Sequence, residues 1–130
     1  MPFFDPRQSP GFEPLPGCRL TTPRGDQLML SHVTMKAGAE IPRHAHHHEQ
    51  GGIVVSGSLE LTIGDETRVL ESGQMYIIPG NTPHAARAIG DVVVMDVFTP
   101  IREDYAAAMQ QGTVADPSHL STAADESDCH

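Results

Sequence analysis

GAEIPRHAHHHEQ, at residues 38–50, is the stretch of sequence that decides the fold and the chemistry of this chain. In a strand, residues two apart point to the same face of the sheet, so His44 and His46 can direct two imidazoles onto one inward patch. A third imidazole from another strand and one oxygen donor would complete a site suited to a first-row divalent metal, with one position left for water or substrate. The alternative is a polar loop whose histidines all face solvent.

A second stretch, GQMYIIPGNTPH at residues 73–84, favours the metal site. It combines a strand-like run, a Pro-Gly turn and a single histidine, His84, at the start of the next strand. For the oxygen donor, Gln50 has the same strand parity as the first two histidines, whereas Glu49 does not. A turn between the histidines and the donor could, however, reset the register. We therefore predict a metal site built from the three histidines and Gln50, with Glu49 as the competing ligand.

The other histidines of the barrel region have different expected places. His47 has the wrong parity for a ligand and is expected on the surface. His48 is expected at the mouth of the cavity, where it would orient a ligand imidazole or contact the substrate. His32 lies on an early strand and is expected to be a packed or hydrogen-bonded residue rather than a ligand.

Outside the two histidine stretches, the chain alternates short strand-like runs with turn-forming residues. Runs rich in Val, Ile, Leu and Thr occur at residues 27–36, 51–56, 58–63, 67–71, 75–79 and 91–98. Breaks rich in Gly, Pro, Asn and Asp lie between them. Many short strands at this spacing predict an all-β sandwich or closed barrel over residues 27–100.

The two ends of the chain depart from this pattern. Prolines at positions 2, 6, 10, 14 and 16 exclude a regular helix or a central strand. Residues 1–26 are therefore expected to form an extended arm across the domain surface, and such an arm or the long edges of a sandwich favour a homodimer. The alanine-rich run at residues 102–111 predicts a short helix or a final turn. Residues 101–130 as a whole are expected to form a C-terminal turn or helix followed by an acidic tail.

Length, charge and cysteine content restrict the class of protein. A chain of 130 residues builds one modest core, and a formal net charge of -9 disfavours nucleic acid or an anionic membrane surface as a partner. No segment approaches the roughly 20 apolar residues that span a bilayer, and the amino terminus lacks a basic segment followed by an apolar run. We expect a cytoplasmic protein that acts on a small ligand.

Cys18 and Cys129 are expected to be unpaired thiols. The alternatives are a disulfide, or a metal site at Cys129 and His130.

A second polar cluster lies in and after the run DVVVMDVF at residues 91–98. Val94, Asp96 and Phe98 share one face, and both faces of this strand are otherwise apolar, so Asp96 is expected inside the barrel. Because an unpaired buried carboxylate is costly, Asp96 either pairs with a barrel-lining Arg or His or acts as an acid/base group. In the functional interpretation, Phe98 forms an apolar wall and Arg102 binds a substrate carboxylate through a bidentate fork.

The two histidine stretches resemble the paired motifs of the cupin superfamily, G-x5-H-x-H-x3-E-x6-G and G-x5-P-x-G-x2-H-x3-N. This resemblance implies a single-domain cupin, a double-stranded β-helix or jelly-roll barrel. Three positions depart from the motifs: Gln50 replaces the glutamate, Asn81 the turn glycine and Ala88 the closing asparagine. Asn adopts positive φ almost as glycine does, so the turn is kept. The neutral amide of Gln50 leaves a divalent ion its full charge, which favours substrate polarisation over oxygen activation.

The segments HAHHHEQ, IPGNTPH and DVFTPIREDY narrow the resemblance to the pectin degradation protein KdgF family. Members of that family convert cyclic 4,5-unsaturated monouronates, left by pectate and alginate lyases, into linear keto sugars. The resemblance implies metal ligation by His44, His46, Gln50 and His84, and catalysis or substrate contact by Asp96, Phe98 and Arg102. It thereby implies a small anionic sugar acid as substrate, with Asp96 moving protons.

The donor set suits one divalent ion of Ni, Zn, Mn, Co or Fe. Two other functions are compatible with the same residues. An iron-dependent dioxygenase also uses three histidines and an oxygen donor. A cupin that binds a metal or a small ligand without turnover is the second alternative, because a fold and a metal do not by themselves imply catalysis.

Overall fold

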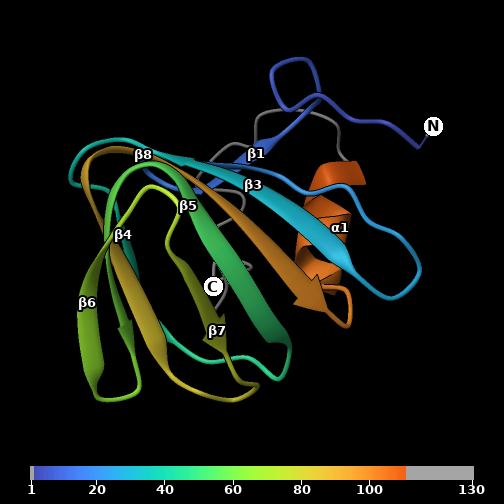
Figure 1. Ribbon diagram of the computed structural model, residues 1–130. Helices are drawn as coiled ribbons and strands as arrows, with labels where there is room; N and C mark the ends of the chain where they lie inside the picture. Colours follow the sequence, from blue (N-terminus) through green and yellow to red (C-terminus); the bar gives the residue numbers. More distant parts are fainter. Residues whose placement is uncertain (1, 111–130) are drawn as a thin grey trace.

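Eight antiparallel strands and one helix make up residues 2–110, which are the residues described by this computed structural model. The elements are β1 Phe12–Leu15, β2 Cys18–Thr21, β3 Met29–Met35, β4 Glu40–His44, β5 Glu49–Ile63, β6 Glu66–Glu71, β7 Met75–Ile78, β8 His84–Thr99 and α1 Glu103–Gln110 (Figure 1). The predicted acidic tail, with Cys129 and His130, lies outside the described residues. Within residues 2–110, no helix is both long and apolar enough to cross a membrane.

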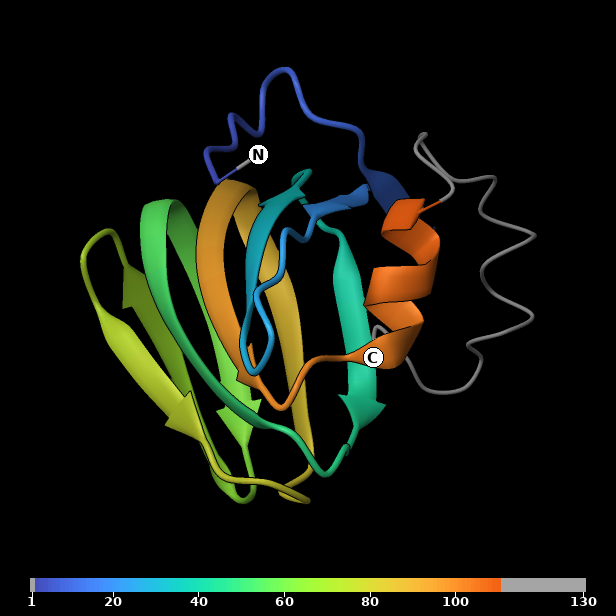
Figure 2. The ribbon, with the colours of Figure 1, turned by 90° about the vertical axis from the view of Figure 1, so that its right-hand side faces the viewer.

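The long strands β5 and β8 pair with each other along nearly their whole length and form the centre of the barrel. Register shifts between Val54 and Ser58 bend the pair. On one side of the bend, β5 pairs with β7 and β8 pairs with β3. On the other side, β5 pairs with β6 and β8 pairs with β4. Figure 2 shows the curved ribbons of β5 and β8 running through both halves. This arrangement is the jelly-roll barrel that the strand pattern and the motifs predicted.

The N-terminal segment differs from the expected surface arm over residues 12–21. Here β1 and β2 form a hairpin, and β2 pairs with β3 as part of the sheet. Phe12, Cys18 and Leu20 are buried in the core. Pro14 falls in β1, which is an edge strand, where a missing backbone N–H is tolerated. The prolines therefore exclude a central strand, as predicted, but they do not exclude this hairpin.

The predicted C-terminal helix is present as α1, and it packs against the barrel. Tyr105 and Ala108 form its buried face. The ring of Tyr105 lies 5.5 Å from that of Phe12 in β1 and 5.7 Å from that of Phe98 in β8, measured between centroids. The helix therefore joins the N-terminal hairpin to the end of the barrel where β8 finishes.

Candidate functional site

Three histidines from the two sequence stretches converge inside one end of the barrel. His44 ends β4 and His84 begins β8, and the antiparallel ladder sets them opposite each other, with ring centroids 4.2 Å apart. The His46 ring lies 5.6 Å from that of His44 and 4.9 Å from that of His84. One nitrogen from each of the three lies within 4.8 Å of the other two. His46 follows the end of β4 in a loop, so this convergence comes from the loop conformation rather than from strand parity.

The turn after β7 fixes the loop that carries His46. The N–H of Asn81 donates to the carbonyl oxygen of His46 at 2.7 Å. Gly80 packs so closely that a Cβ atom there would lie 2.5 Å from the carbonyl oxygen of His47. Asn81 has a φ of 63°, which confirms the predicted tolerance of positive φ at this position. The second sequence stretch therefore positions the first, in addition to supplying His84.

Each of the three histidines donates its Nδ1–H to the backbone carbonyl of a residue two positions away. The pairs are His44 with Pro42 at 2.8 Å, His84 with Thr82 at 2.8 Å and His46 with His48 at 3.2 Å. A carbonyl oxygen only accepts hydrogen bonds, so Nδ1 carries the proton and Nε2 keeps its lone pair. The three rings are thus held in the tautomer that ligates through Nε2.

The surroundings of the cluster keep these imidazoles neutral. Burial lowers the pKa of His44 and of His46 to about 3, and it also lowers the pKa of His84. The positive charge of Arg102 acts in the same direction on all three rings. Neutral imidazole is the form that binds a metal ion. The cluster is therefore ready to bind a cation without first losing protons.

Gln50 is a buried amide on the cavity that His44 and His84 also line, and its oxygen is a further potential donor. It is buried in β5, whereas the competing Glu49 is exposed. Nε2 of His46, Nε2 of His84 and Oε1 of Gln50 are buried and make no hydrogen bond to any residue that the structure describes. Unpaired buried polar atoms are costly, and the nitrogens of His46 and His84 lie close enough to that of His44 for one cation to bind all three. Three nitrogen donors and one oxygen donor suit a first-row divalent metal.

Asp96 lies in an inward-facing row that crosses four strands. Ser31 of β3, Asp96 of β8, Gly52 of β5 and Tyr76 of β7 are successive register partners. The hydroxyl of Tyr76 donates to Oδ1 of Asp96 at 2.5 Å, and the amide of Gln50 donates a second hydrogen bond to Asp96. A Cβ atom at Gly52 would overlap both Oδ1 of Asp96 and the Tyr76 ring. The glycine therefore allows the tyrosine and the carboxylate to meet across β5.

The environment of Asp96 suits an acid/base group. Burial raises its pKa to about 7, while the hydrogen bonds from Tyr76 and Gln50 act in the opposite direction. Burial also raises the pKa of Tyr76 well above its ordinary value, so its hydroxyl remains a donor. A carboxyl group with a pKa near neutrality can both accept and release a proton. The predicted burial of Asp96 is confirmed, and its partners are a phenol and an amide.

Arg102 follows β8 and is buried despite its charge, with 3% of its surface exposed. Its Nε and Nη2 donate to the two carboxylate oxygens of Asp104 at 3.3 and 2.9 Å. The guanidinium carbon lies 4.0 Å from the ring centroid of Tyr105 and 5.3 Å from that of Phe98. The fork that we expected to bind a substrate carboxylate is therefore used by Asp104. Arg102 lines the cavity, and its guanidinium contacts Asp104 and the rings of Tyr105 and Phe98.

A single cavity of about 50 Å³ connects these groups. Its polar lining consists of Ser31, His44, Gln50, Tyr76, His84, Asp96, Arg102 and Tyr105, and Phe98 is among its apolar lining residues. Its lining combines many apolar side chains with a few polar ones, as is typical of small-molecule sites. The structure thus places His44, Gln50 and His84, together with all three predicted catalytic residues, on one cavity. His46 belongs to the histidine cluster but does not line the cavity.

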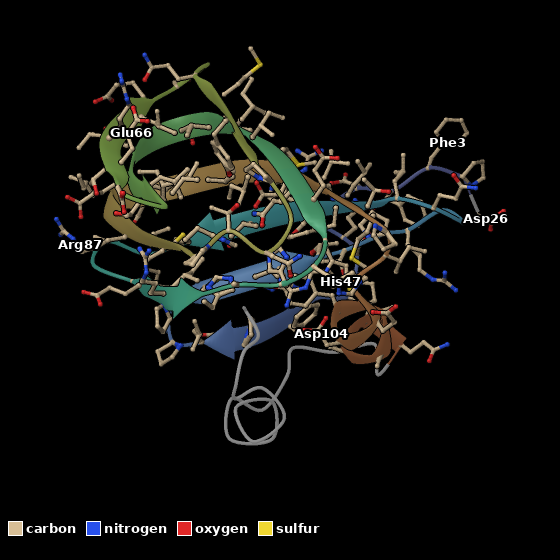
Figure 3. All side chains as sticks on the ribbon, turned by 90° about the horizontal axis from the view of Figure 1, so that it is seen from below. Phe3, Asp26, His47, Glu66, Arg87 and Asp104 are labelled. Carbon is tan, nitrogen blue, oxygen red and sulfur yellow. The ribbon has the colours of Figure 1, made fainter. Side chains whose placement is uncertain are left out.

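His47 and His48 lie outside the cavity lining. His47 is exposed, as expected, and Figure 3 shows it at the same end of the barrel as Asp104, beside α1. His48 is buried with its Nε2 3.6 Å from the carboxylate of Glu103 in α1, so it lies against the helix and does not line the cavity. His32 is partly buried on β3 and lies outside the histidine cluster.

Comparison with known proteins assigns the chain to a family. Residues 31–98, which include the histidine cluster and Asp96, match the family model described as Cupin domain. The chain belongs to the cupin family. The solved structure of KdgF from Halomonas sp. is similar to this chain: it is 32% identical, with a TM-score of 0.75, and the match covers 80% of this chain and 97% of that one.

Two curated relatives are also similar in sequence. The pectin degradation protein KdgF of Dickeya dadantii is 34% identical over 82 residues, which cover 62% of this chain and 74% of that protein. A protein named H2HPP isomerase, from Bacillus subtilis, is 44% identical over 80 residues, or 57% of this chain. The chain spans about a third of that relative, 32% of its length. The resemblance to cupins of the KdgF type, predicted from the motifs, is confirmed.

Tyr76 and Gly52 are site residues that the sequence argument missed. Tyr76 shares inward parity with Ile78 on a recognised strand, so alternation alone could have placed it in the barrel. Gly52 is one of two consecutive glycines inside β5, and glycine within a strand often marks the close approach of another group. Both signals are local, whereas the contact of Tyr76 with Asp96 depends on how β5 aligns with two neighbours.

Proposed function

We propose that this protein converts cyclic 4,5-unsaturated monouronates into linear keto sugar acids, with the help of one divalent metal ion. The observation that carries the proposal is the buried Asp96, a proton-exchanging carboxyl group on the same cavity as the histidine cluster, Gln50 and Arg102. The names of the relatives support it, because two are KdgF proteins and one is an isomerase. The proposed reaction is likewise an isomerisation, in which no atoms are added or removed.

The cavity offers matching groups for a small sugar acid. The buried positive charge of Arg102 attracts the uronate carboxylate, while Asp104 keeps the guanidinium in place. Phe98 and Tyr105 provide apolar walls beside it. Nearby charge in a cavity shielded from water acts over short distances with little screening. A monouronate therefore binds with its carboxylate toward Arg102 and its ring toward Asp96.

Asp96 carries the proton in both halves of the reaction. It first accepts the proton of the anomeric hydroxyl, and the bond between C1 and the ring oxygen breaks. C1 becomes an aldehyde, while the electron pair stays on the former ring oxygen as an enolate conjugated with the carboxylate. Asp96 then returns the proton to C4, which gives a 2-keto acid. The product has the same atoms as the substrate, and no external oxidant or reductant is needed.

The other residues hold Asp96 and the substrate in place for these transfers. The donation from Tyr76 fixes Oδ1 of Asp96, and the donation from Gln50 fixes the carboxylate relative to the histidines. His44, His46, His84 and Gln50 would hold the divalent ion. Such an ion supplies Lewis-acid stabilisation of negative charge on a substrate oxygen.

The test follows loss of the conjugated enol-ether absorbance when the metal-loaded protein meets a 4,5-unsaturated galacturonate. We expect consumption well above the spontaneous rate, and a drop of at least about 100-fold in Asp96→Asn. Asp91→Asn is the matched control, because this carboxylate lies on the same strand but is exposed and bonds to the N–H of Ala37. Equal rates for wild type and Asp96→Asn would remove the mechanism. Oxygen uptake with Fe(II) would favour a dioxygenase instead.

A further inference from the structure

Ser31 occupies the β3 end of the row that contains Asp96. It is the direct register partner of Asp96, it lines the cavity, and none of its surface is exposed to solvent. Its Oγ makes no hydrogen bond to any residue in the described range 2–110. The other inward positions of β3 are apolar, since Met29, Val33 and Met35 flank it on the same face. A single hydroxyl therefore stands unpaired in an apolar wall, beside the acid/base group.

The position of Ser31 separates it from an ordinary buried hydroxyl. Tyr76 and Gln50 bond to Asp96 from the side of β5 and β7, whereas Ser31 lies across the ladder on β3. The cavity lining includes both Ser31 and Asp96, so a small molecule there meets both side chains. Thr22 is another buried hydroxyl without a hydrogen bond among the described residues, but it does not line the cavity. A buried group without a partner weakens a fold, so a partner supplied by the ligand accounts for Ser31.

We propose that Ser31 is a substrate-binding residue, whose hydroxyl pairs with a ring hydroxyl of a sugar acid next to the atom that exchanges its proton with Asp96. A serine hydroxyl both donates and accepts, which matches a sugar hydroxyl, while the carboxylate of the same ligand is matched by Arg102. This assignment deepens the proposed function and rests on it for the substrate class. A cavity built to bond a hydroxyl also discriminates against analogues that lack it.

The experiment compares wild type, Ser31→Ala and Thr22→Val, each loaded with metal. The probe is D-galacturonate, which lacks the 4,5 double bond and is not consumed by the proposed reaction, and its dissociation constant is measured by calorimetry. We expect Ser31→Ala to bind it roughly tenfold more weakly, in line with a lost hydrogen bond in a buried site. Thr22→Val removes a comparable hydroxyl outside the cavity and should bind galacturonate as wild type does.

Two further readouts separate substrate binding from a structural role. In urea without ligand, Ser31→Ala should unfold at the same or a higher concentration than wild type, because it removes an unpaired polar atom. In turnover of the unsaturated monouronate, KM should rise while kcat changes little. A Ser31→Ala protein that loses stability and keeps its affinity would show that Ser31 supports the fold, and the assignment would be overturned.

The same measurements distinguish failure of this assignment from failure of the proposed function. If galacturonate binding depends on Ser31 but no unsaturated monouronate is consumed, the proposed function fails and the assignment stands. If the monouronate is consumed and Ser31→Ala changes neither KM nor the affinity for galacturonate, the assignment fails and the function stands. A wild-type protein that neither binds galacturonate nor consumes the monouronate overturns both.

Discussion

Replacing Gly52 by alanine should disrupt the site through one methyl group. A Cβ atom at this position overlaps Oδ1 of Asp96 and the hydroxyl end of Tyr76, which are the two ends of the hydrogen bond that crosses β5. The carboxylate and the phenol belong to different neighbouring strands, so both must move apart to make room. The substitution therefore breaks the contact that holds Asp96, without altering any polar group.

The expected loss in the free energy of unfolding follows from these contacts. Overpacking a tight interior costs about 1–3 kcal/mol. Loss of a hydrogen bond to an ionisable carboxyl costs about 1.5–3 kcal/mol more, and the better strand propensity of alanine returns up to about 1 kcal/mol. We expect a net loss of about 2–5 kcal/mol, which lowers Tm by roughly 10 °C or more in a domain of this size. Displacement of Asp96 should also lower kcat on the unsaturated monouronate by about 100-fold.

The neighbouring Gly51 provides the matched control. A Cβ atom there points to the other face of β5 and meets the terminal Cδ1 of Ile77 at 3.2 Å, an atom that a small rotation can move. Thermal unfolding followed by circular dichroism and the absorbance assay would be run on both variants. Gly51→Ala should keep its activity and most of its stability. If Gly52→Ala proves as stable and as active as Gly51→Ala, the crossing contact between Tyr76 and Asp96 does not support the site.

Three other predictions concern the metal, the pH and the assembly. Reconstituted wild type should bind one equivalent of divalent metal by elemental analysis and gain thermal stability from it, and His84→Ala should lose both effects. In metal-free protein, the folded-state pKa values of His44 and His46, about 3, lie below the ordinary value of 6.5. The unfolded chain then binds more protons at these two sites between these values, so their contribution to stability is full above about pH 6.5 and is lost as the pH falls. Asp96, with its pKa raised to about 7, contributes in the opposite direction, but it is one group against two. We therefore expect the urea midpoint to fall from pH 7 to pH 5, and an unchanged midpoint contradicts this. The outer face of the sheet formed by β3, β8, β5 and β7 carries the exposed register partners Leu30 and Val97, with Ile77 on the same face. We predict that two 14.0 kDa chains associate through this face as a homodimer. Sedimentation should give a dimer that Ile77→Asp dissociates, and a monomeric wild type would refute it.

Local periodicity was sufficient to predict most of the barrel, because inward and outward residues alternate along each strand. In β8 the buried positions Val92, Val94, Asp96 and Phe98 follow this alternation. The hairpin of β1 and β2 was missed because proline was given the same weight everywhere. The position of Pro14 on an edge strand, which decides whether proline is tolerated, depends on the order of strands in the sheet.

The residues of the candidate site also fall into two groups: those that nearby sequence predicts, and those whose role depends on how distant strands align. The motif spacing and strand alternation singled out the histidines, Gln50 and the burial of Asp96, but the loop at residues 45–48 brings His46 to the cluster, which strand parity did not predict. The role of Asp104 was missed although it lies two residues from Arg102, since a sequence does not tell whether an arginine uses its fork on a neighbour or on a ligand. Tyr76 was missed because its contact is set by the alignment of three strands.

Gln50 joins the two halves of the site, and this gives a physical reason for its departure from the cupin motif. Its Oε1 is the buried end without a hydrogen bond to a described residue, while its amide N–H donates to Asp96. A glutamate at this position would place a second carboxylate against Asp96, and two like charges in contact oppose each other's ionisation. It would also remove the donor that Asp96 uses. The amide at position 50 therefore serves the buried acid and, in the proposed ligand set, would also bind the metal, so we expect the identities of residues 50 and 96 to be coupled.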